Sequence, residues 1–358
     1  MTRRDVIRAA GAAISLRAGS AELTALDPYS PKRAVHGTLR SHGSDLAGLM
    51  QLWQRGFQAF HPAVRFENFL KSSDSAINGL VAGADLAPSG REAELAELLS
   101  FQETFGYEPL SIAVATGSFD VLGRTWGVVI FVHKDNPITA FSLDQLDGIF
   151  GAERTGGWQG LKWMPHTRPA ERNLRKWGQL GLTGEWEQLP IQTYGYAPSG
   201  MSNFFELAVF HGGTKWNENY RQYVETGSKL VGGTGAEALT IQRMFQELAS
   251  DRRGIAWAGM AQARGVAGVK PVSIGAVSGG PSIYPSKASF QNRTYPLVRS
   301  IFMHVNRPPN QSLNYAVEEF LRYILSREGQ QAVVVQSEYI PLTAEMTLEE
   351  LRKIERSG

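Results

Sequence analysis

The stretch IQTYGYAPSGMSNFFELAVF, residues 191–210, contains in one run the unit from which this fold is built. A strand candidate leads into a polar turn, where Ser199 and Gly200 open a helix that carries Phe204 and Phe205. Serine and glycine are favoured at this position because the first amide hydrogens of a helix have no partner within the helix. The pattern predicts a strand, a turn and a helix in succession.

The same construction occurs twice in the first quarter of the chain. In HGSDLAGLMQLWQRGFQAF, residues 42–60, Ser44 and Asp45 precede apolar residues at helical spacing, so their side-chain oxygens are candidate helix caps. The alternating segment VRFENFL then runs into a polar turn that contains Ser72 and Ser73. Three such junctions predict an α/β architecture whose ligand-binding groups gather at strand ends.

Two further segments, around residues 125–132 and 295–305, have the composition of buried strands although they lie far apart in the sequence. The region between them has helices and strands of its own, and 358 residues exceed what one hydrophobic core usually organises. We therefore expect an inserted second lobe. The expected parts are an export signal and linker (1–35), a first lobe (36–133), a second lobe (134–292), the return of the first lobe (293–346) and a C-terminal tail helix (347–358).

Composition excludes several classes of protein and site. The 36 basic and 34 acidic residues give a net charge of +2 and form no basic tract, so we expect no nucleic-acid partner. The absence of cysteine removes thiol nucleophiles, disulfides and Cys-ligated zinc. His36 and His42 are near each other, but no acidic residue stands at metal-ligand spacing, so neither a metal nor a cofactor is expected.

The N-terminus resembles a twin-arginine export signal, because Arg3 and Arg4 precede an apolar stretch from Ala9 to Leu16. An export signal of this kind predicts a periplasmic or extracellular protein. The alternative is an amphipathic N-terminal segment on a cytoplasmic protein. No later run of about 18 apolar residues is present, so we expect no membrane span.

The residues favour binding over catalysis. Helices that open with serine and glycine direct free N–H groups and the positive end of the helix dipole outward, and three converging termini would suit an anion. Each terminus taken alone is commonly a structural cap. No GxSxG nucleophile elbow occurs, and GGTGAEALT lacks the lysine of a phosphate loop, so we expect no enzyme and no catalytic residue.

The order and spacing of these segments resemble the phosphate-binding solute receptors of ABC-type phosphate importers, which belong to the two-lobed, type II periplasmic binding protein superfamily. The resemblance runs from about His36 to Leu342. The matching segments are HGSDLAGLMQLW, FHPAVRFE, SSDSAINGLVAGADLAPSGRE, GYEPLSIAVAT, VVIFVHKDNPI, SLDQLDGIFGAE, WGQLGLTGEW, YGYAPSGMSNFF, YPLVRSIFMHVN and FLRYILSREGQQAVVVQSEYIPL.

The resemblance implies an α/β fold of two lobes with hinge strands near residues 132 and 294, closing on a small oxyanion, with phosphate favoured. It implies the membrane subunits of an ABC importer as partners, and a monomer. The expected ligand-binding residues are Ser44, Asp45, Ser72, Ser73, Ser89, Arg91, Tyr196, Ser199, Gly200 and Met201.

The sequence departs from the pattern of these receptors at three positions. Tyr196 and Met201 stand where an arginine and a threonine are usual, and Gly90 replaces a polar residue. A phenol offers one O–H and no positive charge, whereas a guanidinium offers five donors. Arg91 and Arg40 are candidates for the missing charge, or are solvated surface residues. The alternative function is a diverged sensor or interaction module without tight phosphate binding; a hydrolase with an unrecognised site is a third hypothesis.

Overall fold

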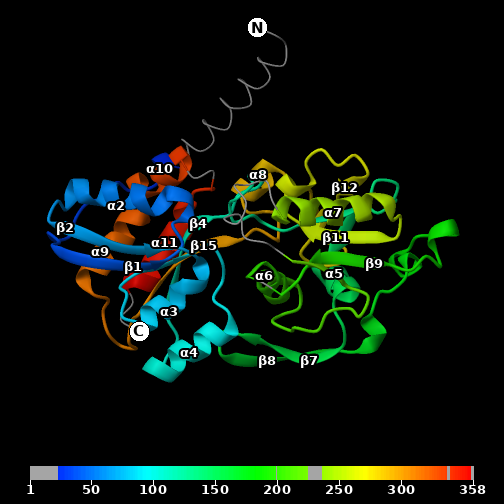
Figure 1. Cartoon of the computed structure of the whole chain (residues 1–358), viewed down its shortest axis with the longest axis horizontal. Helices are drawn as coiled ribbons and strands as arrows, with labels where there is room; N and C mark the ends of the chain where they lie inside the picture. Colours follow the sequence, from blue (N-terminus) through cyan, green and yellow to red (C-terminus); the bar gives the residue numbers. More distant parts are fainter. Residues whose placement is uncertain (1–22, 199, 225–235, 337–338, 356–358) are drawn as a thin grey trace, which may run out of the picture. The chain divides into compact units, whose positions relative to one another are not determined.

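The computed structural model describes residues 23–198, 200–224, 236–336 and 339–355 (Figure 1). The chain divides into two compact units. Unit 1 is made from Met1–Thr116 and Ser300–Gly358, and unit 2 from Gly117–Arg299. The chain therefore passes from one unit to the other twice, once on each side of the inserted unit 2.

These boundaries differ from the lobe boundaries that the sequence predicted. Residues 117–133 belong to unit 2 and not to the first lobe, because β5 (Val129–His133) pairs with β11 (Gly254–Ala258) and β12 (Val269–Pro271). Residues 293–299 also belong to unit 2. Both segments that we expected to be hinge strands, near residues 132 and 294, thus lie inside unit 2; hinge motion itself remains a prediction.

Unit 1 contains two small sheets and six α-helices among its described residues. β1 pairs in parallel with β2, and β15 lies between β3 and β4, antiparallel to both. The elements are β1 (Gly37–Gly43), η1 (Leu46–Gly48), α2 (Leu49–Phe60), β2 (Val64–Leu70), η2 (Ser73–Ser75), α3 (Ala76–Val81), β3 (Ala87–Ser89), α4 (Leu95–Phe105), β4 (Leu110–Thr116), β15 (Ser300–Val305), α9 (Tyr315–Ile324), α10 (Arg327–Gln336) and α11 (Ala344–Glu355).

The core of unit 1 follows from the helical spacing of apolar residues in α2. Leu49, Trp53 and Phe57 lie one turn apart, and all three are fully buried. Phe57 packs edge-on against Phe320 of α9, with ring centroids 5.2 Å apart. The indole N–H of Trp53 donates to the carbonyl of Gly329 in α10 at 2.8 Å, so the polar atom of this buried ring is satisfied.

Both ends of the described chain pack into unit 1, whereas the sequence predicted a linker up to residue 35 and a separate tail helix over 347–358. Leu26 and Tyr29 are only 4% and 7% exposed, and Ile354 of α11 is 4% exposed. The interpretation as a linker did not take account of the isolated apolar residues of this segment, because they stand among prolines and charged residues. The predicted export signal itself lies in residues 1–22, outside the described residues.

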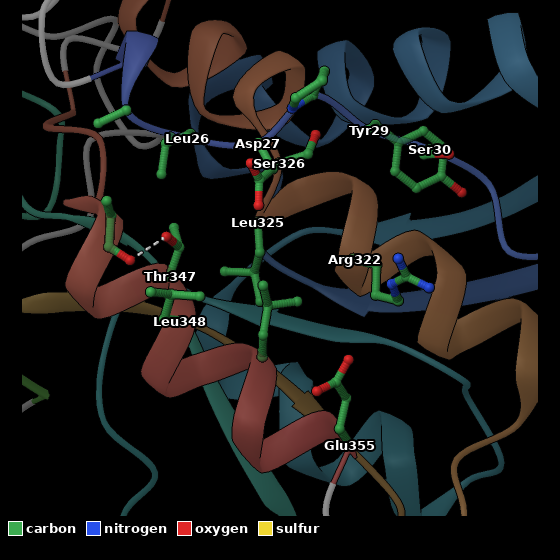
Figure 2. A pocket seen from close by; sticks show the side chains of 14 residues that line it. Leu26, Asp27, Tyr29, Ser30, Arg322, Leu325, Ser326, Thr347, Leu348 and Glu355 are labelled. Carbon is green, nitrogen blue, oxygen red and sulfur yellow. Dashed lines mark hydrogen bonds between the residues drawn. The ribbon is translucent and has the colours of Figure 1, made fainter.

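Tyr29 is the polar anchor of the N-terminal segment. Its hydroxyl donates to Oε2 of the fully buried Glu319 at 2.6 Å and lies 2.8 Å from Nε2 of His61. Its N–H donates to Glu328 at 2.6 Å. Figure 2 shows the residues that line a pocket between this segment and the helices, among them Leu26, Arg322 and Thr347. The pocket has a volume of about 180 Å³. The segment is therefore fixed to α9, α10 and α11 together.

Unit 2 surrounds a five-stranded sheet in the order β10-β9-β11-β5-β12. Smaller sheets join β14-β13-β6 and the hairpin β7-β8. The elements are β5, β6 (Ala140–Ser142), α5 (Leu143–Phe150), β7 (Arg154–Gln159), β8 (Lys162–Arg168), η3 (Ala170–Arg172), η4 (Trp177–Leu180), η5 (Gly184–Trp186), β9 (Gln192–Tyr196), α6 (Gly200–Val209), β10 (Arg221–Tyr223), α7 (Ala236–Ser250), β11, η6 (Met260–Ala263), β12, β13 (Ser273–Gly275), β14 (Ser282–Ile283) and α8 (Lys287–Gln291).

Helices cover both faces of the five-stranded sheet, which explains why β5 and β11 are buried along their whole length. Phe131 of β5 packs edge-on against Phe245 of α7 at 5.2 Å. On the opposite face of the sheet, Trp257 of β11 stacks on Phe205 of α6 at 5.1 Å. Figure 1 shows α7 and α6 on the two sides of the strands. The sheet thus holds the start of α6 in place.

Within the described ranges, no helix combines the length and the apolar character that crossing a bilayer demands.

Replacing Tyr29 by Phe tests whether the N-terminal segment is part of the fold. The change removes a hydrogen bond to a buried carboxylate, so the free energy of unfolding in urea should fall by about 1–2 kcal/mol. The matched control is Tyr284→Phe, at a side chain that is 56% exposed. Equal stability of Tyr29→Phe and the unmodified chain would contradict the anchoring role.

Candidate functional site

In unit 1, three loops that follow β1, β2 and β3 meet at the carboxyl ends of these strands. The N–H of Ser44 donates to the carbonyl of Pro88 at 2.8 Å, and the N–H of Ser72 donates to the carbonyl of Gly43 at 3.0 Å. Gly43 has φ +147°, and a Cβ there would lie 2.2 Å from the Pro88 carbonyl oxygen, so only glycine allows this approach. Loops at strand ends are where α/β folds place ligands.

The loops after β2 and β3 are joined by side chains that the sequence predicted as ligand-binding residues. The Oγ of Ser73 accepts the N–H of Gly90 at 3.0 Å. Ser89 is 2% exposed, and its Oγ donates to the carbonyl of Arg91 at 2.8 Å and accepts the Arg91 N–H at 3.2 Å. The structure therefore brings Ser73, Ser89 and Arg91 together, but the Ser89 hydroxyl is already used within its own turn.

Ser44 and Asp45 do not cap the long helix, contrary to the prediction. Leu46 and Ala47 have positive φ of 49° and 58°, which breaks the chain direction, and α2 starts only after Gly48 at φ +88°. The Oγ of Ser44 accepts the N–H of Leu46 at 3.1 Å. Side chains rarely adopt this left-handed backbone, and such strain tends to gather at functional sites. The apolar residues of this stretch have the spacing of a regular helix, so the sequence did not predict this tight loop.

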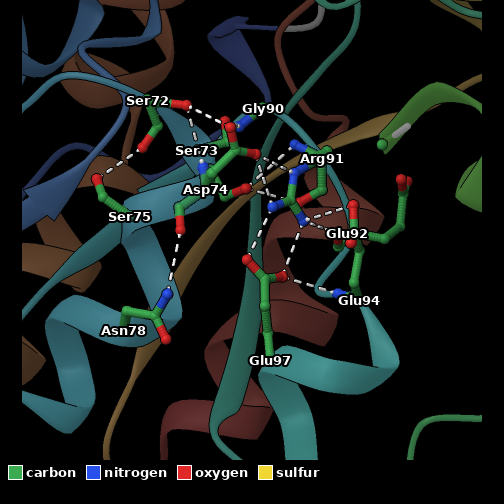
Figure 3. Close-up of polar contacts among 12 residues, drawn as sticks. Ser72, Ser73, Asp74, Ser75, Asn78, Gly90, Arg91, Glu92, Glu94 and Glu97 are labelled. Atoms are coloured by element: carbon green, nitrogen blue, oxygen red, sulfur yellow. Dashed lines mark hydrogen bonds and ion pairs between the residues drawn. The ribbon is translucent and has the colours of Figure 1, made fainter. Parts of the chain in front are cut away.

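Arg91 lies at the centre of a cluster of carboxylates (Figure 3). Its guanidinium makes two bonds of 2.8 Å to Glu97 and bonds of 2.9 and 3.2 Å to Oδ1 of Asp74. A third carboxylate, of Glu94, is 3.6 Å away. The side chain is only 11% exposed. Arg91 is thus neither a solvated surface residue nor a cation available to a ligand, because its charge is balanced within the cluster.

Electrostatics within this cluster favour the charged forms of Arg91 and Asp74. Burial lowers the pKa of Arg91, but the hydrogen bonds to Glu97 and Asp74 outweigh it and raise the pKa above the usual value. Burial raises the pKa of Asp74, and its hydrogen bonds to Arg91 and Ser72 turn this into a net decrease. The second candidate cation, Arg40, is 58% exposed and faces Asp85 at 3.8 Å. Neither arginine supplies unbalanced charge to the loops of unit 1.

In unit 2, the predicted site residues Tyr196, Gly200 and Met201 lie around the turn between β9 and α6. Ser199 lies outside the described residues. Tyr196 is 1% exposed, and its ring packs against Trp126 and Trp257 with centroid distances of 5.6 and 5.1 Å. Its position is therefore that of a core aromatic residue, beneath the turn.

A functional candidate that the sequence analysis missed is Arg299. This side chain is 1% exposed, yet its guanidinium contacts the first two residues of α6: it donates to the Gly200 carbonyl at 3.1 Å and to the sulfur of Met201. It also lies 5.1 Å over the ring of Phe204. The sequence does contain one arginine inside the apolar strand candidate around residues 295–305, which is an unusual place for a charged residue. Its contact residue Met201, however, lies almost a hundred residues earlier in the chain.

The two histidines that we paired from their spacing do not share a site. His36 precedes β1 and is exposed, whereas His42 is near the end of β1 and its ring packs against that of Phe69 at a centroid distance of 5.1 Å. Six residues of extended strand separate them by about 20 Å. Among the residues that the structure describes, no group of three potential metal ligands was found.

Sequence comparison finds relatives of one family. No protein-family model matches the chain. The chain is 32% identical over 334 residues to the phosphate-binding protein PstS of Pseudomonas aeruginosa PAO1, covering 92% of this chain and 91% of that protein, and the protein of strain UCBPP-PA14 gives the same figures.

Solved structures agree at the level of the fold. PstS from Borrelia burgdorferi has a TM-score of 0.51 at 14% identity, with 86% of this chain and 99% of that chain covered. An ABC-type phosphate transport receptor from Vibrio cholerae has a TM-score of 0.50 at 16% identity, with 86% and 100% covered. The predicted two-lobed α/β fold of periplasmic binding proteins is confirmed.

The burial of Tyr196 gives a stability prediction. Tyr196→Arg would place a charge among Trp126 and Trp257, so the free energy of unfolding in urea should fall by about 3 kcal/mol or more. Tyr196→Phe keeps the ring and should cost about 1 kcal/mol or less. If Tyr196→Arg is as stable as Tyr196→Phe, the ring is not a core residue.

The pH dependence of stability should report on His304, which pairs with Ala87 across β15 and β3. Its Nδ1 lies 2.8 Å from Ser111 Oγ, and its buried Nε2 has no hydrogen-bond partner among the described residues. Burial, and then the charge of Arg91, lowers the pKa of His304 to about 4. The unfolded chain binds this proton first, so stability should fall as the pH drops from about 6.5 to 4.

His304→Asn should remove the contribution of this histidine to the pH dependence of stability. The free energy of unfolding that is lost between about pH 7 and pH 4 should then be smaller by about 2–3 kcal/mol. Urea unfolding at several pH values measures it. The control is His36→Asn, since His36 is exposed. A pH profile of His304→Asn that parallels the unmodified chain would contradict the role of His304.

Proposed function

The chain belongs to the family of the phosphate-binding protein PstS, and from this premise we propose that it is an extracytoplasmic receptor that binds phosphate for an ABC importer. The observation that carries the proposal is the convergence of three polar loops at the carboxyl ends of β1, β2 and β3. Hydrogen bonds from the Ser44 N–H to the Pro88 carbonyl and from the Ser72 N–H to the Gly43 carbonyl hold these loops together before any ligand binds. Such preorganisation lowers the entropic cost of binding.

We propose that the ligand is held by Ser44, Ser72 and Ser73 in these loops of unit 1. In unit 2, Ser199 and Gly200 remain proposed ligand-binding residues. Hydroxyl and backbone N–H groups can donate to oxyanion oxygens, and each bond to a charged group contributes about 1.5–3 kcal/mol. Four or five such bonds suffice for micromolar binding after the cost of association is subtracted.

The proposal also covers the location of the protein and its partner. A receptor that delivers its ligand to an importer acts outside the cytoplasm, as a monomer, and docks on the membrane subunits of that importer. It performs no chemistry on the ligand: its relatives are named as binding proteins. Release follows when docking favours the open state of the receptor over the closed one.

One observation favours the alternative, a sensor or interaction module that retains the fold without tight phosphate binding. Arg91 is balanced by carboxylates, and Tyr196 is a neutral aromatic residue in the core. The loops of unit 1 therefore offer neutral donors, which bind an anion less tightly than a guanidinium does.

Calorimetric titration separates these functions. We expect phosphate to give saturable heat at one site per chain with micromolar or tighter affinity, and sulfate, molybdate and organic phosphates to bind more weakly. Ser73→Ala removes the acceptor of the Gly90 N–H and a donor of the loop, so it should weaken phosphate binding about tenfold. Ser100→Ala on α4 is the control and should bind as the unmodified chain does.

The remaining outcomes decide between the hypotheses. No heat with any of these anions would support the sensor and contradict the receptor. Slow hydrolysis of an organic phosphate would support an enzyme.

A further inference from the structure

We propose that unit 2 carries a second binding site, for a neutral saccharide, in the pocket between the β7-β8 hairpin and the loop that follows α6. The pocket has a volume of about 500 Å³, within the range of small-molecule sites, and is lined by the hairpin, by η3 and by residues 212–215. All of these segments belong to unit 2. None of the lining residues is a proposed anion-binding residue, so the inference goes beyond the proposed function and does not depend on it.

Two exposed tryptophans at this pocket are the first observation. Trp158 and Trp163 are direct partners across the hairpin, with ring centroids 5.4 Å apart in an edge-on arrangement. They are 38% and 45% exposed. Five tryptophans elsewhere in the chain are buried: Trp53, Trp126, Trp177, Trp186 and Trp257. An exposed indole offers a ligand a large, rigid contact surface at low cost in conformational entropy.

Glycines fix the two rings in place, which is the second observation. A Cβ on Gly156 would lie 2.8 Å from the ring of Trp163, and a Cβ on Gly212 would lie 2.0 Å from the carbonyl oxygen of Trp158. The N–H of Trp158 donates to the Gly212 carbonyl at 2.9 Å. Close backbone contact therefore holds the hairpin against the loop after α6. A pocket formed before the ligand arrives loses little conformational entropy on binding.

The polar side chains around the rings suit a ligand with many hydroxyl groups. Thr155, Thr167 and Thr214 line the pocket, and all three are exposed. Glu171 and Lys215, which are also exposed, come from η3 and from the loop after α6. A threonine hydroxyl donates and accepts, a carboxylate accepts and an ammonium group donates. Donors and acceptors thus stand on several sides of the aromatic pair.

The formal charges at the pocket cancel, which favours an uncharged ligand. The charged lining residues are Arg154, Arg168, Lys215, Glu153 and Glu171. Beneath the pocket, the two buried arginines share Asp147 at 2.6 and 3.3 Å. Three cations therefore meet three carboxylates. An ionic ligand gains no net attraction from such a set, unlike a ligand in a pocket lined by one sign of charge.

A sugar ring has the properties that this pocket matches. One face of the ring consists of C–H bonds and can lie flat on an indole, while the hydroxyl groups at its edge reach the surrounding polar side chains. A purely apolar ligand would cover those polar groups without pairing them. A cross-strand aromatic pair also stabilises its own hairpin, so the test has to separate stability from binding.

The test is calorimetric titration of the full chain with two neutral tetrasaccharides of glucose, cellotetraose and maltotetraose. At least one should give saturable heat at one site per chain, with millimolar or tighter affinity. Trp163→Ala removes a stacking surface and should weaken that binding at least about tenfold. Trp163→Phe keeps an aromatic face and should lose less. Thr214→Val exchanges a hydroxyl for a methyl group and should weaken binding about threefold.

Tyr284→Ala is the matched control, because Tyr284 is an aromatic residue of unit 2 that is 56% exposed and lies outside this pocket. It should leave saccharide binding unchanged. Thermal unfolding of every variant separates a loss of the hairpin from a loss of contact with the ligand. Phosphate is titrated in parallel, and its affinity should be the same in all of these variants, so the two proposed sites succeed or fail in separate measurements.

The possible results decide the proposal. Absence of saturable heat with both tetrasaccharides up to about 10 mM overturns it. Unchanged saccharide affinity in a folded Trp163→Ala variant overturns it too, since the ligand then binds elsewhere. If Trp163→Ala does not fold, Trp163→Phe and Thr214→Val decide, because both keep the shape of the pocket more closely. Binding of phenol without binding of either tetrasaccharide would make the pocket a site for aromatic compounds and would contradict the saccharide assignment.

Discussion

The tight approach of Gly43 to the carbonyl of Pro88 is the constraint on which the arrangement of unit 1 depends. No side chain fits there, because a Cβ would lie 2.2 Å from the Pro88 oxygen. This approach lets Ser44 donate to Pro88, and lets the Gly43 carbonyl accept the N–H of Ser72. Two peptide hydrogen bonds thus tie three loops together at the strand ends, and the serine side chains take their positions from the backbone.

The charged groups of the two units have different roles. In unit 1, Arg91 satisfies Asp74 and Glu97 and so holds the loop after β3 against α4. A buried ion pair of this kind adds little net stability, but removing one member leaves a buried charge without its partner. In unit 2, Arg299 contacts a carbonyl and a thioether at the start of α6.

Local pattern was enough to predict the strands and helices around the site, but not their exact junctions. The apolar spacing of Trp53 and Phe57 placed α2 correctly, and the family followed from the order of many short segments. Spacing could not show that Leu46 and Ala47 take a left-handed backbone, since no sequence rule places two such residues before a glycine. It also could not find Tyr29 or Arg299, because each acts through a partner distant in the sequence.

One backbone hydrogen bond joins the two points at which the chain enters and leaves unit 2. Arg299 is the last residue of unit 2, and its carbonyl accepts the N–H of Gly117, the first residue of unit 2. The backbone at the two crossings is thus joined directly. A ligand that binds one conformation of these crossings more tightly shifts the population toward it, and only in proportion to that difference in affinity.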